Sequence, residues 1–153
     1  MAYKGRFVPR NPEKYKGNPT NIIYRSLWER NLMRYLDQHP QIIQWQSEEF
    51  FVPYRSPIDG KVHRYFPDFW VKKRTKQNEV EVVVIEVKPF AQTKAPDKNK
   101  KYATPSGRVS RRFLREVATF GVNEAKWKAA REFCADREWK FQIITEKELG
   151  IKY

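Results

Sequence analysis

Apolar residues recur along most of the chain at spacings typical of helices and strands. From Asn21 to Gln38 the apolar residues Leu32, Met33 and Leu36 form a stripe at helical spacing, and Pro40 ends the predicted helix.

Three strands are predicted after this helix. The residues from Ile42 to Tyr54 alternate loosely and are rich in Ile, Trp and Phe, as one or two strands would be. The stretch Ser56–Gly60 is a turn signal and indicates a hairpin. A second strand is predicted from Val62 to Lys72, and a third, strongly β-branched strand from Val80 to Lys88.

The second half of the chain predicts a loop, a helical region and a last strand. Phe90 to Arg112 shows no apolar period and is predicted to be a loop. Residues 113–138 are predicted to be helical, as one helix or as two pieces broken near Gly121, with Asn123 capping the second piece. Lys140 to Glu146 is the final predicted strand.

This order of elements predicts an α/β fold in which an antiparallel meander and the last strand form a mixed sheet flanked by helices. Residues 1–20 are predicted to precede that domain, which covers residues 21–153, as an extended basic arm. The arm has five basic residues against one acid and is rich in Pro and Gly, and Tyr3, Phe7 and Tyr15 are spaced so that they anchor it. A disordered tail is the alternative.

The composition limits the class of protein. A chain of 153 residues builds one hydrophobic core without disulfides. The single Cys134 excludes an intramolecular disulfide, and with only His39 and His63 beside it a zinc site of several Cys and His ligands is excluded as well. We therefore expect a protein made in a reducing cytoplasm. No apolar run approaches the length of a membrane span.

The charge indicates an anionic partner. Lys and Arg number 31 against 18 Asp and Glu, which gives a net charge of +13, and 15% of the residues are aromatic. This balance favours a nucleic acid, with an anionic membrane surface or a well-solvated surface as the alternatives. From Lys94 to Arg115 there are eight basic residues and one acid, so over half of the net charge falls in that span.

Two carboxylates near strand ends are the candidate metal ligands. Glu86 and Lys88 end an apolar strand and share one of its faces, and Asp68 follows Pro67 among aromatic residues. Burying such carboxylates is expensive. A divalent metal shared by Asp68 and Glu86 would offset that cost, because Mg²⁺ prefers hard oxygen ligands and leaves positions for phosphate oxygens. Glu29 lies within the apolar stripe of the first helix and is expected to face the sheet.

Each of these residues also has a structural interpretation. The sequence from Ser26 to Glu29 fits a capping box at the start of the helix. Glu86 and Lys88 are compatible with a surface ion pair, and Asp68 with a turn after Pro67.

Three motifs resemble a known family. Pro67-Asp68 followed by Glu86-Val87-Lys88 after 17 intervening residues resembles the PD-(D/E)XK signature of restriction-endonuclease-like nucleases. Together with the segment Tyr24–Glu29, these motifs look like the TnsA-type transposase endonucleases. The whole chain is similar to the head-completion nucleases of T-even-like tailed phages, whose arm is rich in Tyr-Lys-Gly, as at Tyr3–Gly5 and Tyr15–Gly17 here.

The resemblance implies an αβββαβ core and metal-dependent cleavage of DNA phosphodiesters, with Mg²⁺ or Mn²⁺ as one or two ions. By position, Asp68 and Glu86 would be metal ligands, with the carbonyl of Val87 as an extra ligand. Lys88 would orient or activate the attacking water, and Glu29 would hold a second metal or a metal-bound water. These four acidic and basic side chains are the expected catalytic residues.

The expected partner is DNA, with phage head, portal or neck proteins as docking partners of the arm and no membrane. We expect the protein in the host cytoplasm during assembly or in the virion.

Two rival functions remain open: a transposase or repair endonuclease with the same site, and a non-catalytic DNA-binding structural neck protein. If His63 does not contact DNA, it is an ordinary strand residue. The alternative role of Arg25 is an ion pair with an acid. The residues expected to contact DNA are Arg25, His63, Arg64, Lys94, Lys98, Lys100, Lys101, Arg108, Arg111 and Arg112.

Overall fold

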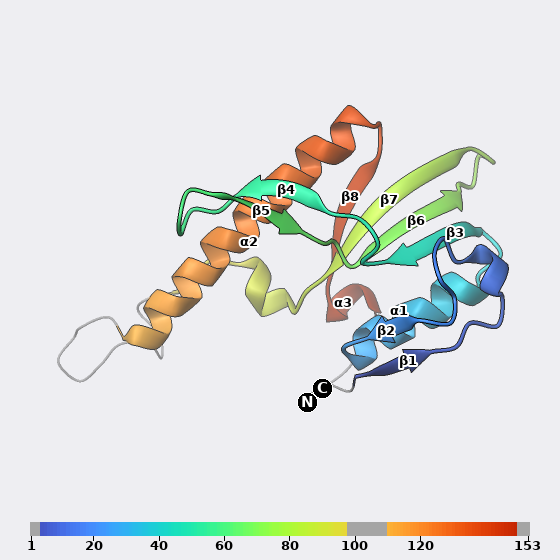
Figure 1. Ribbon diagram of the computed structural model, residues 1–153, viewed down its shortest axis with the longest axis horizontal. Coiled ribbons are helices and arrows are strands. Elements are labelled where there is room, and N and C mark those ends of the chain that lie inside the picture. The colour runs from blue at the N-terminus through green and yellow to red at the C-terminus, as the bar shows by residue number, and fades with distance from the viewer. Residues whose placement is uncertain (1–3, 98–109, 150–153) are drawn as a thin grey trace.

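A four-stranded mixed sheet forms the centre of the fold in a computed structural model, which describes residues 4–97 and 110–149 (Figure 1). Its strand order is β3 (Ile42–Ser47), β6 (Phe69–Arg74), β7 (Val80–Val87) and β8 (Lys140–Ile144). The pairs β3–β6 and β6–β7 are antiparallel, and β8 runs parallel to β7. The predicted mixed sheet flanked by helices is confirmed.

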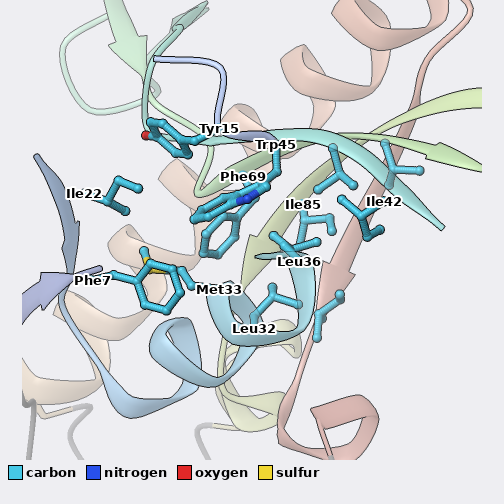
Figure 2. Close-up of a cluster of buried hydrophobic side chains, with 13 residues drawn as sticks. Phe7, Tyr15, Ile22, Leu32, Met33, Leu36, Ile42, Trp45, Phe69 and Ile85 are labelled. Carbon is cyan, nitrogen blue, oxygen red and sulfur yellow. The ribbon is translucent and has the colours of Figure 1, made fainter. Parts of the chain in front are cut away.

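The sheet separates two layers of packing. Helix α1 (Leu27–Gln38) covers one face, and helix α2 (Arg111–Asp136) contributes to the clusters on the other. Because side chains alternate along a strand, Phe69 and Ile85 belong to the α1 cluster while Trp70 and Val84 pack with Cys134 of α2. Figure 2 shows the first cluster, with the predicted stripe of α1 packed against the sheet.

The N-terminal segment packs on the α1 side of the molecule. Strand β1 (Gly5–Phe7) pairs antiparallel with β2 (Ile22–Tyr24), with the short 3₁₀ helix η1 (Pro12–Lys14) between them. Phe7, Tyr15 and Ile22 are buried in the same cluster as the α1 stripe (Figure 2). The described part of residues 1–20 therefore contributes to the core.

A hairpin is inserted between β3 and β6. Strands β4 (Val52–Arg55) and β5 (Val62–Tyr65) pair antiparallel, as the turn signal predicts, and pack on α2 through Val52 and Tyr65. Two short helices complete the described elements: the 3₁₀ helix η2 (Phe90–Thr93) and α3 (Glu146–Leu149). No helix within residues 4–97 and 110–149 is long and apolar enough to cross a membrane.

Two predicted boundaries in the first half are wrong. The first helix begins at Leu27 rather than Asn21, because β-branched residues 22 and 23 are extended in β2 and Ser26 caps the helix. The strand predicted over 62–72 is divided into β5 and β6. Pro67 lies fully buried between them and has no N–H with which to continue a ladder.

The second half also differs from the prediction. Helix α2 is continuous through Gly121 and starts at Arg111 after the N-cap Ser110, so the predicted cap Asn123 is instead a buried residue within the helix. A glycine within a helix costs only about 1 kcal/mol, which the packing of α2 outweighs. The predicted loop over 90–112 contains η2 and the start of α2, and its residues 98–109 lie outside the described ranges. Strand β8 ends at Ile144, before α3.

Candidate active site

Three acidic residues lie at the same end of three neighbouring strands. The registers pair Ser47 with Phe69 and Phe69 with Ile85, so the next residues, Glu48, Asp68 and Glu86, continue this row past the ends of β3 and β6 and along β7. The N–H of Glu48 donates to the carbonyl of Asp68 at 3.1 Å, which ties the first two together. The sheet therefore gathers three carboxylates whose successive members are 20 and 18 residues apart in sequence.

Asp68 is held by the backbone of the next strand. Its Oδ2 accepts a hydrogen bond from the N–H of Val87 at 2.7 Å. Burial raises the pKa of Asp68 well above its usual range, and the charges of Glu86 and Glu29 raise it further, against the opposing effect of the Val87 N–H. The surroundings of Asp68 therefore disfavour its ionised form. A cation bound beside the carboxylate would offset this cost.

Glu86 and Lys88 lie on one face of the strand end, as the pleat predicts. Glu86 is buried, and its Oε2 lies 3.8 Å from the Nζ of Lys88. The phenol of Tyr65 is also buried, and burial followed by the charge of Glu86 raises its pKa. The Glu86 carboxylate therefore has an ammonium on one side and a phenol nearby.

Glu29 combines the two interpretations given for it above. The Ser26 hydroxyl accepts from the Glu29 N–H at 3.2 Å, and Glu29 Oε2 accepts from the Arg25 N–H at 3.1 Å, which resembles a capping box shifted by one residue. Burial raises the pKa of Glu29, and the charges of Glu48 and Glu86 add to this effect. Its carboxylate therefore caps the helix and also belongs to the acidic cluster.

Glu48 is a residue of this cluster that the sequence patterns did not reveal. Its backbone is left-handed, with φ of 52°, and its carboxylate forms an ion pair with the Arg25 guanidinium. The one sequence signal for Glu48 is that an acid directly follows a predicted strand. Its place in the cluster depends on the pairing of β3 with β6, which starts after Asp68. Arg25 is thus paired with an acid, which is one of the two roles predicted for it.

The donor set fits a hard divalent cation bound by a pair of carboxylates. Asp68 and Glu86 come from adjacent strands and offer oxygen ligands, and Mg²⁺ in proteins is commonly held by one or two carboxylates with water and phosphate oxygens. Over residues 4–97 and 110–149, no three side chains of His, Cys, Asp or Glu are grouped closely enough to enclose a metal ion by themselves.

The predicted DNA contacts are distributed over several surfaces. His63 and Arg64 are exposed on β5, where His63 Nε2 lies 2.8 Å from Asp59 Oδ2 and Arg64 lies over the Phe51 ring at 5.0 Å. Lys94 follows η2, the short helix after β7, and its Nζ lies 4.7 Å from the Phe90 ring centroid.

The remaining predicted contacts belong to the basic stretch before and at the start of α2. Arg111 and Arg112 are exposed in the first turn of α2, and Arg112 pairs with Glu116 at 3.1 Å. The other predicted contacts lie outside the described residues: Lys98, Lys100, Lys101 and Arg108.

Comparisons with known proteins agree with this architecture. A family model described as the TnsA-like endonuclease N-terminal domain matches residues 39–146, which include the sheet, Asp68, Glu86 and Lys88. The chain belongs to the TnsA-like endonuclease family. It is also 41% identical over 155 residues to the head completion nuclease of Enterobacteria phage T4, a match that covers 99% of each protein. Both similarities support a nuclease.

Proposed function

We propose that the protein is a Mg²⁺-dependent DNA nuclease with a restriction-endonuclease-like αβββαβ core, and that it hydrolyses phosphodiester bonds at the Asp68–Glu86 pair. The observation that carries this proposal is the meeting of the partly buried Asp68 carboxylate, just before β6, with the buried Glu86 carboxylate of the adjacent strand β7, whose Oε2 lies 3.8 Å from the Lys88 ammonium. Membership of the TnsA-like endonucleases supports the same chemistry.

Each side chain has a distinct role in this proposal. Asp68 and Glu86 would hold Mg²⁺ or Mn²⁺, as one or two ions, with the Val87 carbonyl as a further ligand. A divalent metal held there would supply Lewis-acid polarisation of a phosphoryl oxygen and a nucleophile near neutral pH. Lys88 orients the attacking water and stabilises negative charge on the phosphate, and Glu29 positions a second metal or water from the start of α1.

The proposed biological task follows from the phage relative. Because the similarity to the T4 head completion nuclease extends over the full length, we infer that the protein processes packaged DNA during head completion, before heads and tails are joined. The activity would then be needed in the host cytoplasm during assembly, and the protein would also contact head, portal or neck proteins. DNA is the proposed substrate, read mainly through its phosphates.

The test is cleavage of plasmid and linear duplex DNA by the wild type and by Asp68→Asn, Glu86→Gln and Lys88→Met variants, with Mg²⁺ and with EDTA. We expect metal-dependent cutting that falls at least about a hundredfold in each variant, an effect of about 2.7 kcal/mol on the barrier. Conversion of plasmid to nicked and linear forms would mark endonucleolytic cleavage.

The matched control is Glu81→Gln, the same chemical change at the other end of β7, where Glu81 pairs with Lys73 and Lys140. It should cut like the wild type. Cutting that survives both carboxylate substitutions would refute the assignment of the site. A wild type that binds duplex DNA without cutting it in Mg²⁺ or Mn²⁺ would favour a structural DNA-binding protein instead.

A further inference from the structure

Four arginines surround a cavity on the side of α1 that faces the N-terminal segment. The cavity has a volume of about 520 Å³ and lies between β1, the residues after it, Tyr24 and α1. Figure 1 shows β1 and β2 alongside this helix. The arginines of the lining are Arg6, Arg10, Arg30 and Arg34.

The positive charge of this cavity is compensated only in part, by one carboxylate against four guanidiniums. None of the four guanidiniums forms an ion pair with an acid among residues 4–97 and 110–149. Asp37 is the one acid in the lining, and its side chain is fully buried and accepts the N–H groups of Arg10 and Asn11 at 2.8 and 2.9 Å. Guanidiniums stay charged at any ordinary pH, so gathering four of them favours an anionic ligand.

The arrangement depends on the docked N-terminal segment. Arg30 and Arg34 are four residues apart and therefore lie on one face of α1. The Arg30 guanidinium lies over the Tyr24 ring, 5.8 Å from its centroid. That ring crosses β1 at Gly5, where a Cβ would come within 2.3 Å of the tyrosine oxygen. The segment thus supplies Arg6 and Arg10 and also the ring that supports Arg30.

Two residues that line the cavity are direct sequence neighbours of residues in the candidate active site. Tyr24 precedes Arg25, the partner of Glu48, and Arg30 follows Glu29, whose carboxylate belongs to the acidic cluster. A polyanion that extends from the acidic cluster along α1 would reach Arg30 and then Arg34. Guanidiniums bind phosphate oxygens in a bidentate manner, which suits a phosphodiester backbone.

We propose that this four-arginine cavity binds backbone phosphates of the DNA substrate beyond the scissile bond. The proposal rests on the proposed nuclease function, and it assigns part of the DNA contact to the N-terminal segment and α1 rather than to the basic stretch before α2. The cavity strengthens binding without reading sequence, because phosphates carry no base information.

The experiment measures duplex binding by fluorescence anisotropy in EDTA, where cleavage is suppressed, over a range of NaCl concentrations. We compare the wild type with Arg30→Gln/Arg34→Gln. Each lost phosphate contact lowers the slope of log K against log salt by about 0.9, so we expect a drop of roughly one to two and an affinity reduced about tenfold or more at low salt. Arg30→Lys/Arg34→Lys, which keeps the charges, should retain most of the slope.

The control variant Lys76→Gln/Lys140→Gln removes two charges near the other end of the sheet, at the β6–β7 turn and at the start of β8. It should bind DNA with the wild-type slope. Circular dichroism and thermal melting establish that each variant is folded. If the double arginine variant binds duplex DNA like this control, the proposal is overturned.

A second binding assay with labelled polyglutamate separates DNA from an acidic protein segment. Loss of polyglutamate binding in Arg30→Gln/Arg34→Gln, with duplex binding unchanged, would overturn the proposal in favour of a protein-docking site. The failure of the proposed function is distinguishable: a wild type that neither binds nor cuts DNA refutes both ideas. A wild type that cuts DNA while the arginine variant binds it equally well refutes only this one.

Discussion

Glu29 has two roles that a pair of substitutions separates. Ser26→Ala removes the hydroxyl that accepts the Glu29 N–H but leaves the carboxylate, and it should cost about 1 kcal/mol of stability while cleavage stays near the wild-type rate. Glu29→Gln keeps an acceptor for the Arg25 N–H but removes the charge, and it should lower cleavage at least about tenfold. Urea unfolding and plasmid cleavage, measured on both variants, test this.

The pH dependence of stability adds an independent check in metal-free buffer. Burial raises the folded-state pKa of Glu29, so its ionised form is disfavoured in the folded protein. The wild type therefore loses stability as pH rises from the ordinary glutamate pKa through the raised one, and Glu29→Gln lacks that loss. The variant should gain stability relative to the wild type between acid and neutral pH. Equal losses of activity and stability in both variants would mean that Glu29 is only a cap.

At the scale of single residues, the sequence identifies candidate site residues more readily than the residues that lie beside them in the fold. Asp68, Glu86 and Lys88 are visible because a charge at the end of an apolar strand is unusual, and the pleat correctly places Glu86 beside Lys88. Glu48 is not visible, since its place depends on the register of β3 against β6 and on a left-handed backbone. Such long-range registers leave no local pattern in the sequence.

Among the elements, the N-terminal segment is joined to α1 mainly at Asp37. The buried Asp37 carboxylate accepts hydrogen bonds from two backbone N–H groups of the segment. The main-chain carbonyl of Asp37 accepts hydrogen bonds from Asn11 Nδ2 at 2.8 Å and from Lys14 Nζ at 3.0 Å. Asp37→Ala would leave two backbone donors without their charged acceptor, so we expect a loss of about 3 kcal/mol or more in urea unfolding. The four-arginine cavity should then be lost as well, with weaker duplex binding.

Asp136→Ala is the matched control, because that aspartate is exposed in the last turn of α2. It should change stability by less than about 0.5 kcal/mol. A cost below about 1 kcal/mol for Asp37→Ala would contradict the role given to the buried carboxylate.

The order of elements follows from patterning, whereas several of their ends depend on tertiary context. The sequence predicts α1 from its apolar stripe and β7 from its β-branched run, and both have a buried face. A break near Gly121 is one of the two predictions for this region, yet a Cβ there would meet only Pro57 Cγ at 4.0 Å, and α2 continues through it. Intrinsic propensity is a weak guide where a long helix packs along its length.

Taken as a whole, the molecule has one sheet that both helical layers share, so its parts should unfold together. The strands β6 and β7 contribute alternate residues to the α1 cluster and to the clusters with α2. Loss of either layer would expose apolar residues of the same strands. A probe on α2 should therefore report the unfolding of the whole described structure.

Cys134 is such a probe, because its thiol is buried on α2 against Trp70 and Val84 of the sheet. Burial raises the pKa of Cys134 to about 11, so little thiolate is present at pH 8 even apart from its inaccessibility. We expect a thiol reagent such as DTNB to label the native protein at least about a thousandfold more slowly than the urea-unfolded chain. The labelling rate should rise with urea along the slope of global unfolding. Rapid labelling in the absence of urea, or a labelling rate that does not depend on urea, would show instead that α2 opens separately from the sheet.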